Sequence, residues 1–171
     1  FSCKEVQNLV TAIEVCEDLW VSQPPSGAHT MAGAYIIANP SASDETTGKN
    51  NYRLELVGGQ SARLICAYLY ADAGEGESTT DLVFSGHNMI AENGILLKQS
   101  ERFSTGLIIS EIDLGRLSSE RRRISTFPED KTGYVTVSYS IPSIQDDIKK
   151  QLPETVLTRF IDSSPFVPTD K

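Results

Sequence analysis

The stretch Ala12-Ile13-Glu14-Val15-Cys16-Glu17-Asp18-Leu19-Trp20 passes from a short apolar run to a thiol and then to two acids. The run 12–15, in which Glu14 points the other way, predicts a strand near the edge of a covered sheet. A strand fixes the backbone while the loop after it opens to substrate, so a nucleophile is well displayed at such a junction. Cys16 is therefore a candidate nucleophile, and a small buried thiol is the alternative interpretation.

Alternating helices and strands are predicted after this stretch. Pro24-Pro25-Ser26 supplies a helix start, which predicts a short helix over 27–33, and the apolar run 34–38, bounded by Asn39-Pro40, predicts a buried strand. A polar loop follows over 41–48. A second helix is predicted because five side chains share one helical face, namely Leu54, Val57, Ser61, Leu64 and Ile65. The run 67–71 predicts the next strand.

The second half of the chain continues the mixture of strands and helices. The polar segment 74–81 lacks the Gly-Lys-Ser/Thr ending of a phosphate cradle and is predicted to be an ordered turn. Asn93-Gly94 lies between two apolar stretches, which is a strong hairpin signal. A strand is predicted over 108–112 and a helix over 114–124, and 134–139 is the last candidate strand. The order of elements predicts an α/β fold, a layered mixed α and β domain.

Composition limits the class of protein. At 171 residues the chain is long enough for one core and short for two, so it is a single domain or part of a larger one. No apolar run is long enough to cross a bilayer, which argues against a membrane protein. The net charge of -8 argues against a nucleic-acid or anionic-membrane partner, because phosphate binding needs an excess of Lys and Arg. The basic run Arg121-Arg122-Arg123 is interpreted as the solvated last turn of a helix or a contact to a neighbouring domain.

The cysteines and histidines give few further signals. Cys3, Cys16 and Cys66 have neither metal-ligand spacing nor the even number of a disulfide framework, which favours a reducing, cytoplasmic setting. Cys66 is interpreted as a core residue. The two histidines, His29 and His87, lie far apart without ligand-spaced neighbours, so loop or core histidines are favoured over a Cys-His pair or a zinc site. No metal site is predicted.

Ordered blocks across nearly the whole chain resemble one family. The blocks are 13–21, 24–26, 32–34, Asn39-Pro40-Ser41-Ala42-Ser43, 52–53, 60–63, 66–68, 74–81, 92–94, 119–121 and Pro165-Phe166-Val167-Pro168. Together they resemble the glutaminase domain of bacterial glutamine-dependent NAD+ synthetases, a branch of the nitrilase (carbon-nitrogen hydrolase) superfamily. The resemblance implies part of a nitrilase-type α-β-β-α four-layer sandwich.

The resemblance also implies roles for individual residues. Cys16 is implied as the nucleophile that attacks the carboxamide carbon of L-glutamine, forms a γ-glutamyl thioester and releases ammonia, after which water hydrolyses the thioester. The backbone N–H of Glu17 is implied as an oxyanion donor. Ser43, Lys49 and the Glu17 side chain are implied in substrate binding. The family often has Arg in place of Lys49, and Lys keeps the charge but loses the bidentate fork.

Some parts of the family's machinery are expected outside this sequence. The family's general base Glu and oxyanion Lys precede the nucleophile strand, and only fifteen residues precede Cys16. We therefore expect both from an upstream segment, and this chain alone to be inactive. Residues 1–127 are interpreted as the C-terminal portion of the glutaminase domain. Residues 128–171, rich in proline, are interpreted as a peripheral extension and linker toward an ATP-dependent synthetase domain that uses ATP and Mg²⁺. No cofactor is expected within 1–171.

A partial sandwich has a physical consequence. Without its first strands it would expose sheet edges and apolar faces, so we expect a homo-oligomer or pairing with the upstream segment. Two other functions stay open. A stand-alone nitrilase-type amidase would share the cysteine elbow, and in a non-catalytic structural module Cys16 would be only a buried thiol.

Overall fold

The computed structural model describes residues 1–141 and 157–161. The tail block Pro165-Phe166-Val167-Pro168 and most of the predicted extension lie outside the described residues. The proposed boundary at residue 127 therefore stays a prediction. Among the described residues, no helix combines the length and apolar character needed to cross a membrane.

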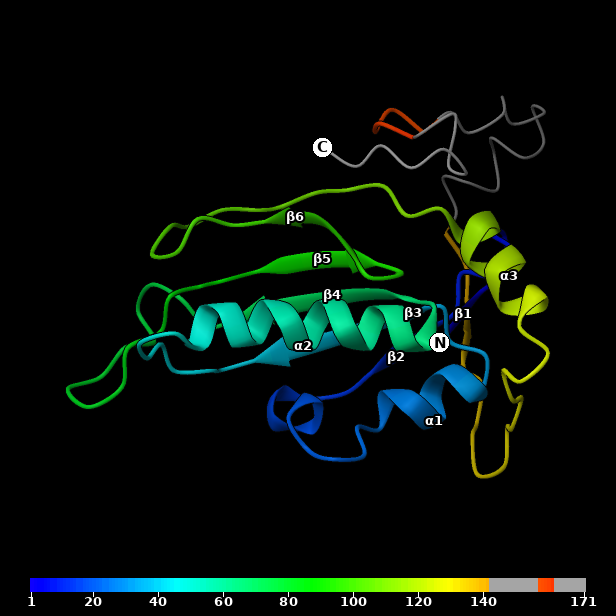
Figure 1. Ribbon diagram of the computed structural model, residues 1–171, viewed down its shortest axis with the longest axis horizontal. Coiled ribbons are helices and arrows are strands. Elements are labelled where there is room, and N and C mark those ends of the chain that lie inside the picture. Colours follow the sequence, from blue (N-terminus) through cyan, green and yellow to red (C-terminus); the bar gives the residue numbers. More distant parts are fainter. Residues whose placement is uncertain (142–156, 162–171) are drawn as a thin grey trace.

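A five-stranded sheet forms the centre of the molecule (Figure 1). Its strands, in spatial order, are β2 (Thr11–Ile13), β3 (Ile36–Ser41), β4 (Ala67–Asp72), β5 (Met89–Glu92) and β6 (Ile95–Gln99). The first three strands are parallel and the last two are added in antiparallel pairing. Because β2 and β3 are parallel, their C-terminal ends lie at the same edge of the sheet, where binding sites of such sheets usually form.

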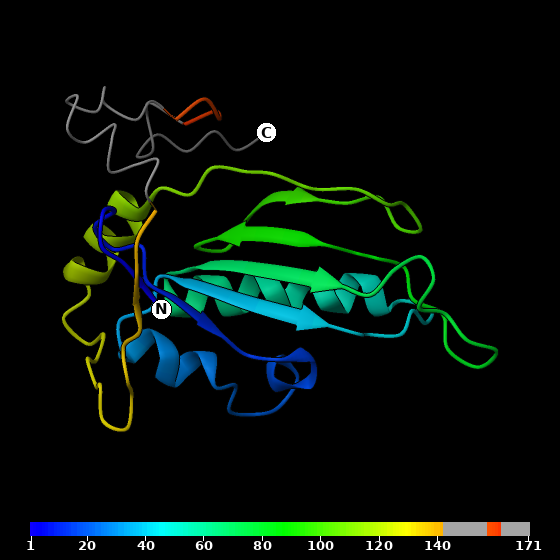
Figure 2. The ribbon, with the colours of Figure 1, turned by 180° about the vertical axis from the view of Figure 1, so that it is seen from behind.

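Helices cover one face of this sheet. The long helix α2 (Lys49–Leu64) runs along the strands in Figure 1, and no long helix runs along their other face, seen from behind in Figure 2. Only the end of that other face nearest α3 is buried, where Ile36 and Ala67 pack with Leu117. The other helices are the 3-10 turn η1 (Cys16–Leu19), α1 (Ser26–Met31) and α3 (Leu114–Arg123). The described part of the chain therefore has one helix layer and one sheet layer, which is half of the predicted α-β-β-α arrangement.

The core lies between α2 and the sheet, as the helical pattern predicts. Val57 and Leu64 on α2 pack with Ile37, Tyr68 and Met89 from the strands, and all five are buried. Arg53, Gln60 and Ser61 complete the buried face of the helix. Ile65, predicted within the helix, instead ends it in a left-handed conformation with φ of 47°.

The β5–β6 hairpin confirms the Asn-Gly signal. Asn93 and Gly94 both have positive φ, as a two-residue type I′ turn requires. A Cβ at Gly94 would lie 2.9 Å from the Cβ of Ala62 on α2, so glycine is also needed for the close approach of the turn to the helix.

Strand β2 and the loop after it correct one prediction. The strand ends at Ile13, and Glu14, not its apolar neighbours, faces the covered side: Glu14 is 1% exposed, whereas Ile13 and Val15 are 48% and 56% exposed. The apolar pattern predicts the wrong orientation because the Glu14 carboxylate accepts hydrogen bonds from buried donors, the Tyr68 hydroxyl and the Ser26 N–H.

Strand β3 corrects a second prediction, because it runs through Pro40 to Ser41 and does not end before Asn39-Pro40. Strand β2 pairs only as far as Ala38, so at Pro40 strand β3 has a neighbour on one side only. Proline lacks the N–H that a second neighbour would need, and it is tolerated here for that reason.

The predicted strand over 108–112 is wrong, because the structure has no strand there. Leu107 and Ile109 are exposed, so the apolar run finds no sheet neighbour. The candidate strand over 134–139 shrinks to β7 (Ser138–Tyr139), which pairs in parallel with β1 (Ser2–Cys3) to form a separate two-stranded sheet. This pairing buries Cys3 beside the start of the chain.

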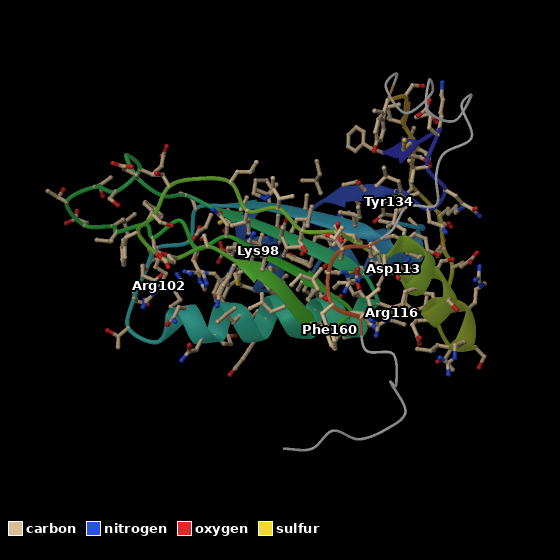
Figure 3. The ribbon with its side chains drawn as sticks, turned by 90° about the horizontal axis from the view of Figure 1, so that it is seen from above. Lys98, Arg102, Asp113, Arg116, Tyr134 and Phe160 are labelled. Carbon is tan, nitrogen blue, oxygen red and sulfur yellow. The ribbon has the colours of Figure 1, made fainter. Side chains whose placement is uncertain are left out.

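Residues 157–161 return to the body of the protein beside the hairpin. Arg159 forms an ion pair with the buried carboxylate of Glu92 on β5, and the side chain of Glu111 accepts hydrogen bonds from Thr158. Phe160 lies near Arg116 on α3, as Figure 3 shows, and both line the same surface hollow. The segment thus bridges the hairpin and α3.

Arg121 corrects the interpretation of the basic run as solvated. Its guanidinium is buried and donates hydrogen bonds to the carbonyls of Ala34, Leu64 and Ile65, at 2.7, 3.1 and 3.0 Å. It also stacks on Tyr35, with 4.1 Å from its central carbon to the ring centroid. Arg121 therefore caps the C-terminal end of α2 and ties α3 to it.

We expect Arg121→Ala to lower the free energy of unfolding by about 2–4 kcal/mol, because three buried carbonyls lose a charged donor. The matched change Arg122→Ala removes an exposed guanidinium whose hydrogen bond is to Ser118, and we expect about 0.5 kcal/mol or less. Urea unfolding of the chain, followed by circular dichroism, measures both. Equal stabilities of the two variants would contradict the capping role of Arg121.

Candidate active site

Cys16 lies at a sharp turn directly after β2. It is the first residue of η1 and has φ of +50°, a left-handed conformation that is uncommon for residues other than glycine. Asp18 closes the turn, because its carboxylate accepts from the N–H of Val15 at 2.7 Å and its own N–H donates to the carbonyl of Val15 at 3.0 Å. Such strain persists only where the surroundings impose it, and it is common at active sites.

The side chain of Asn39 on β3 imposes this conformation. The N–H of Cys16 donates to Oδ1 of Asn39 at 3.0 Å, and Nδ2 of Asn39 donates to the carbonyl of Cys16 at 3.3 Å. The same Nδ2 donates to the hydroxyl of Tyr68 on β4 at 3.0 Å. One buried amide thus holds the backbone on both sides of the thiol.

Glu14 completes the support of this turn. The hydroxyl of Tyr68 donates to one oxygen of the Glu14 carboxylate, and the N–H of Ser26 donates to the other at 2.7 Å. Burial, together with this carboxylate, raises the pKa of Tyr68 far above its usual value. Both oxygens of Glu14 have donors, so it is not free to act as a general base for Cys16.

The thiol opens into a cavity of about 370 Å³ at the C-terminal ends of β2 and β3. Its lining consists of Cys16, Glu17, Trp20, Ala42, Ser43, Asp44 and Lys49. All four residues that the sequence analysis assigned to the site, Cys16, Glu17, Ser43 and Lys49, therefore lie around one space. The nucleophile comes from the end of β2 and the cation from the first turn of α2.

Charge in the cavity is mixed. Lys49 forms an ion pair with Asp44, and this contact holds the pKa of the Asp44 carboxyl below its usual range. The ammonium of Lys49 also lies 5.4 Å from the centroid of the Trp20 ring. Glu17 is exposed at the rim. The cavity thus offers one cation and two carboxylates, which suits a ligand that carries charges of both signs.

Ser43 is buried under the cavity and is held by a polar cluster. Its N–H donates to Oδ1 of Asp72 at 2.8 Å, and its hydroxyl accepts from Nη2 of Arg53 at 3.4 Å. Burial raises the pKa of the Asp72 carboxyl, against the opposing effect of the Ser43 N–H. Arg53 is fully buried and also donates to Glu45 at 3.2 Å.

The sequence analysis missed Arg53 and Asn39 as parts of the site. Arg53 lies on the buried face of α2, four residues before Val57, and a charged residue in that pattern was the available signal. Asn39 offered a similar signal, since it continues the apolar run of a buried strand.

His87 and Cys66 match their structural interpretations, whereas His29 lies on helix α1 and is partly exposed, not in a loop or the core. His87 is buried and lies 3.1 Å from Nη1 of Arg53 and 2.9 Å from Oε1 of Gln99. Because Arg only donates, Nδ1 of His87 is the acceptor and Nε2 carries the proton. His29 contacts the Tyr134 hydroxyl and the Ile13 carbonyl. Cys66 lies in the core, where burial raises its pKa to about 12.

The arrangement can support attack by a thiol on a carbonyl carbon. Cys16 is partly exposed at a rigid turn, and no hydrogen bond joins the Glu17 N–H to another group in 1–141 or 157–161. That N–H follows the thiol directly, which is the usual place of an oxyanion donor. Within the same described ranges, no group of three or more His, Cys, Asp or Glu side chains is placed to hold a metal ion.

Comparison with known proteins gives two clear results, although no family model matches the chain. The chain is 40% identical over 172 residues to the glutamine-dependent NAD(+) synthetase of Mycobacterium tuberculosis, covering 99% of this chain and 25% of that protein. A solved structure of a Saccharomyces cerevisiae member of branch 10 of the nitrilase superfamily matches 68% of this chain and 42% of its own, with 16% identity and a TM-score of 0.57.

The chain has the nitrilase fold. A third match, the glutamine-dependent NAD+ synthetase of Acinetobacter baumannii in complex with ADP, agrees: it has a TM-score of 0.56 and 22% identity, over 63% of this chain and 20% of that one. These matches confirm the resemblance found in the sequence. The chain spans about a quarter of the length of the curated relatives it matches. Within the nitrilase fold, the described residues supply the helix α2, one sheet and the cysteine turn.

Proposed function

We propose that the chain is the later part of the glutaminase half of a glutamine-dependent NAD+ synthetase, which releases ammonia from L-glutamine for amidation of nicotinic acid adenine dinucleotide. The observation that carries the proposal is the position of Cys16. It stands at a strained, doubly held turn and opens into the cavity that Glu17, Ser43 and Lys49 share. The 40% identity over almost the whole chain supports the choice of family.

The reaction proceeds in two steps. The Cys16 thiolate attacks the carboxamide carbon, the carbonyl electron pair moves to oxygen, and the Glu17 N–H donates to the resulting oxyanion. The intermediate collapses and the nitrogen leaves, after protonation, as ammonia, which leaves a γ-glutamyl thioester on Cys16. Water then adds to the thioester carbon and displaces the thiol, which releases glutamate. The general base and the oxyanion Lys come from an upstream segment outside 1–171.

The charges of the cavity fit the amino-acid end of glutamine. Lys49 is the cation of the cavity and would exchange its contact with Asp44 for the α-carboxylate, and the Glu17 carboxylate is available to the α-ammonium. Ser43 lines the same cavity and is held by Arg53 and Asp72. A stand-alone nitrilase-type amidase is the alternative, and paired charges of this kind favour an amino-acid amide over a simple one.

The synthetase domain and the cellular compartment follow from the same family assignment. Residues 128–171 lead toward a synthetase domain that uses ATP and Mg²⁺, outside this sequence. We place the protein in the cytoplasm, because all three cysteines are free in the structure, Cys3 and Cys66 buried and Cys16 partly exposed.

Covalent labelling tests the nucleophile. We expect a glutamine-mimicking electrophile to label Cys16 in a chain extended upstream through the missing Glu and Lys, and glutamine to block the labelling, because both compete for one cavity. In residues 1–171 alone we expect much slower labelling. Intact-mass measurement and peptide mapping give the rates.

The other two thiols are internal controls for this experiment. Cys66 and Cys3 are buried, and burial raises the pKa of Cys66 to about 12, so neither is expected to react in the folded protein. Absence of selective labelling at Cys16 in both chains would leave only the shared fold and refute the glutaminase proposal.

Lys49 tests the recognition of glutamine. In the extended enzyme we expect Lys49→Ala to raise the KM for glutamine about 10- to 100-fold with little change in kcat, because a carboxylate loses its charged partner in both ground and transition states. Lys49→Arg retains the charge and restores the fork, so we expect a KM at or below that of the wild type. A Lys49→Ala enzyme with unchanged KM would remove Lys49 from the site.

The oligomeric state in solution tests the role of the uncovered sheet face. We propose that this face pairs with a second copy or with the upstream segment, because Ile13 and Ile95 on the outer strands are about half exposed, at 48% and 50%. Size-exclusion chromatography with light scattering is expected to show residues 1–171 as a homo-oligomer. A well-behaved monomer at high concentration would contradict the proposal for this chain.

A further inference from the structure

We propose that Asn39 is a positioning residue of the glutaminase reaction, which aims the oxyanion-binding N–H of Glu17 through its hydrogen bonds to Cys16 and is itself held by Tyr68 and Glu14. The inference rests on the proposed function and deepens it. Asn39, Tyr68 and Glu14 do not line the cavity, and Asn39 is joined to it by hydrogen bonds to the Cys16 backbone, so their role is indirect.

The direction of each hydrogen bond in the series from Cys16 through Asn39, Tyr68 and Glu14 to Ser26 is fixed. The N–H of Cys16 can only donate, so the Asn39 atom facing it is Oδ1, and Nδ2 must face the Cys16 carbonyl. Because Nδ2 donates to the Tyr68 oxygen at 3.0 Å, the Tyr68 proton is left for the Glu14 carboxylate. The N–H of Ser26 anchors the far oxygen of Glu14 at 2.7 Å. No rearrangement of the amide keeps all of these bonds.

Peptide geometry links Asn39 to the oxyanion donor. The Cys16 carbonyl and the Glu17 N–H belong to one planar trans peptide, in which the C=O and N–H point in opposite directions. When Nδ2 of Asn39 holds the carbonyl, the Glu17 N–H is directed away from Asn39, and it has no other acceptor among the described residues. Rotation of this peptide would break the hydrogen bond and turn the donor away from the oxyanion.

Burial makes the arrangement hard to replace. Asn39 and Glu14 are each 1% exposed and Tyr68 is 0% exposed, so water does not substitute for a lost bond. The left-handed φ of +50° at Cys16 also favours relaxation once the amide is lost. We therefore expect a change at Asn39 to affect the stabilisation of the oxyanion more than the binding of glutamine.

The test uses the full-length enzyme that contains this segment, with the substitution Asn39→Asp. This change keeps the acceptor for the Cys16 N–H and replaces the donor to the Cys16 carbonyl by an oxygen. We expect kcat for glutamine hydrolysis to fall about 100-fold, the effect of losing one oxyanion donor, with KM changed less than about 3-fold. A γ-glutamyl aldehyde, whose adduct with Cys16 carries an oxyanion, is expected to inhibit about 100-fold more weakly.

Alkylation by iodoacetamide separates positioning from general damage, because that displacement forms no oxyanion. We expect its rate at Cys16 to change less than about 3-fold in Asn39→Asp. Tyr68→Phe, which removes one support of Asn39, is expected to lower kcat in the same direction by about 10-fold. Tyr139→Phe is the control, because Tyr139 lies on β7 in the separate two-stranded sheet and not beside the turn, and its kcat is expected to stay unchanged.

Two results would overturn the proposal. One is an Asn39→Asp enzyme with unchanged kcat and aldehyde inhibition. The other is an equal loss of kcat and alkylation rate, which marks a purely structural role. Failure of the wild-type enzyme to hydrolyse glutamine is a different outcome, because it refutes the proposed function itself.

Discussion

A buried carboxylate two residues before the thiol constrains the whole structure. Glu14 is almost inaccessible to water, and a buried charge is costly unless hydrogen bonds satisfy it. Its donors come from Tyr68 on β4 and from the N–H of Ser26 at the start of α1, and Gln60 on α2 in turn donates to the Ser26 hydroxyl. The end of β2, the helices α1 and α2, and strand β4 are therefore all connected to Glu14. The nucleophile lies two residues after Glu14.

A second buried cluster supports the opposite side of the cavity. Arg53 lies between Glu45 and Asp72, and it reaches the hydroxyl of Ser43. Burial works against the ionised form of Asp72 and raises its pKa. Burial alone would also raise the pKa of Glu45, but hydrogen bonds from Ser85 and Arg53 outweigh it and the pKa is lowered. The nucleophile and the binding side thus rest on separate polar networks, so damage to one need not disturb the other.

Local signals explain which predictions from the sequence are confirmed. The Asn93-Gly94 turn and helix α2 depend on neighbouring residues, and both are confirmed. The orientation of 12–15 was wrong because the partner of Glu14 lies 54 residues away on another strand. Cys16 was a candidate from its place after a strand, whereas Ser43 and Lys49 were assigned by resemblance, since no spacing relates them to it. Asn39 was missed because its task depends on Cys16, 23 residues earlier in the chain.

The register between β2 and β3 connects the fold to the chemistry. Ile13 pairs with Ala38, so Asn39 lies one residue past the last pair, level with the turn that carries Cys16. Side chains alternate between the two faces of a strand, and a shift of one residue would turn Asn39 to the uncovered face. The turn would then lose its amide, and Nδ2 would lose Tyr68. A strand pairing only three residues long therefore decides whether the thiol has a fixed oxyanion donor beside it. The hydrogen bonds of Asn39 and Glu14 in turn favour this register over its neighbours, so the fold and the site stabilise each other.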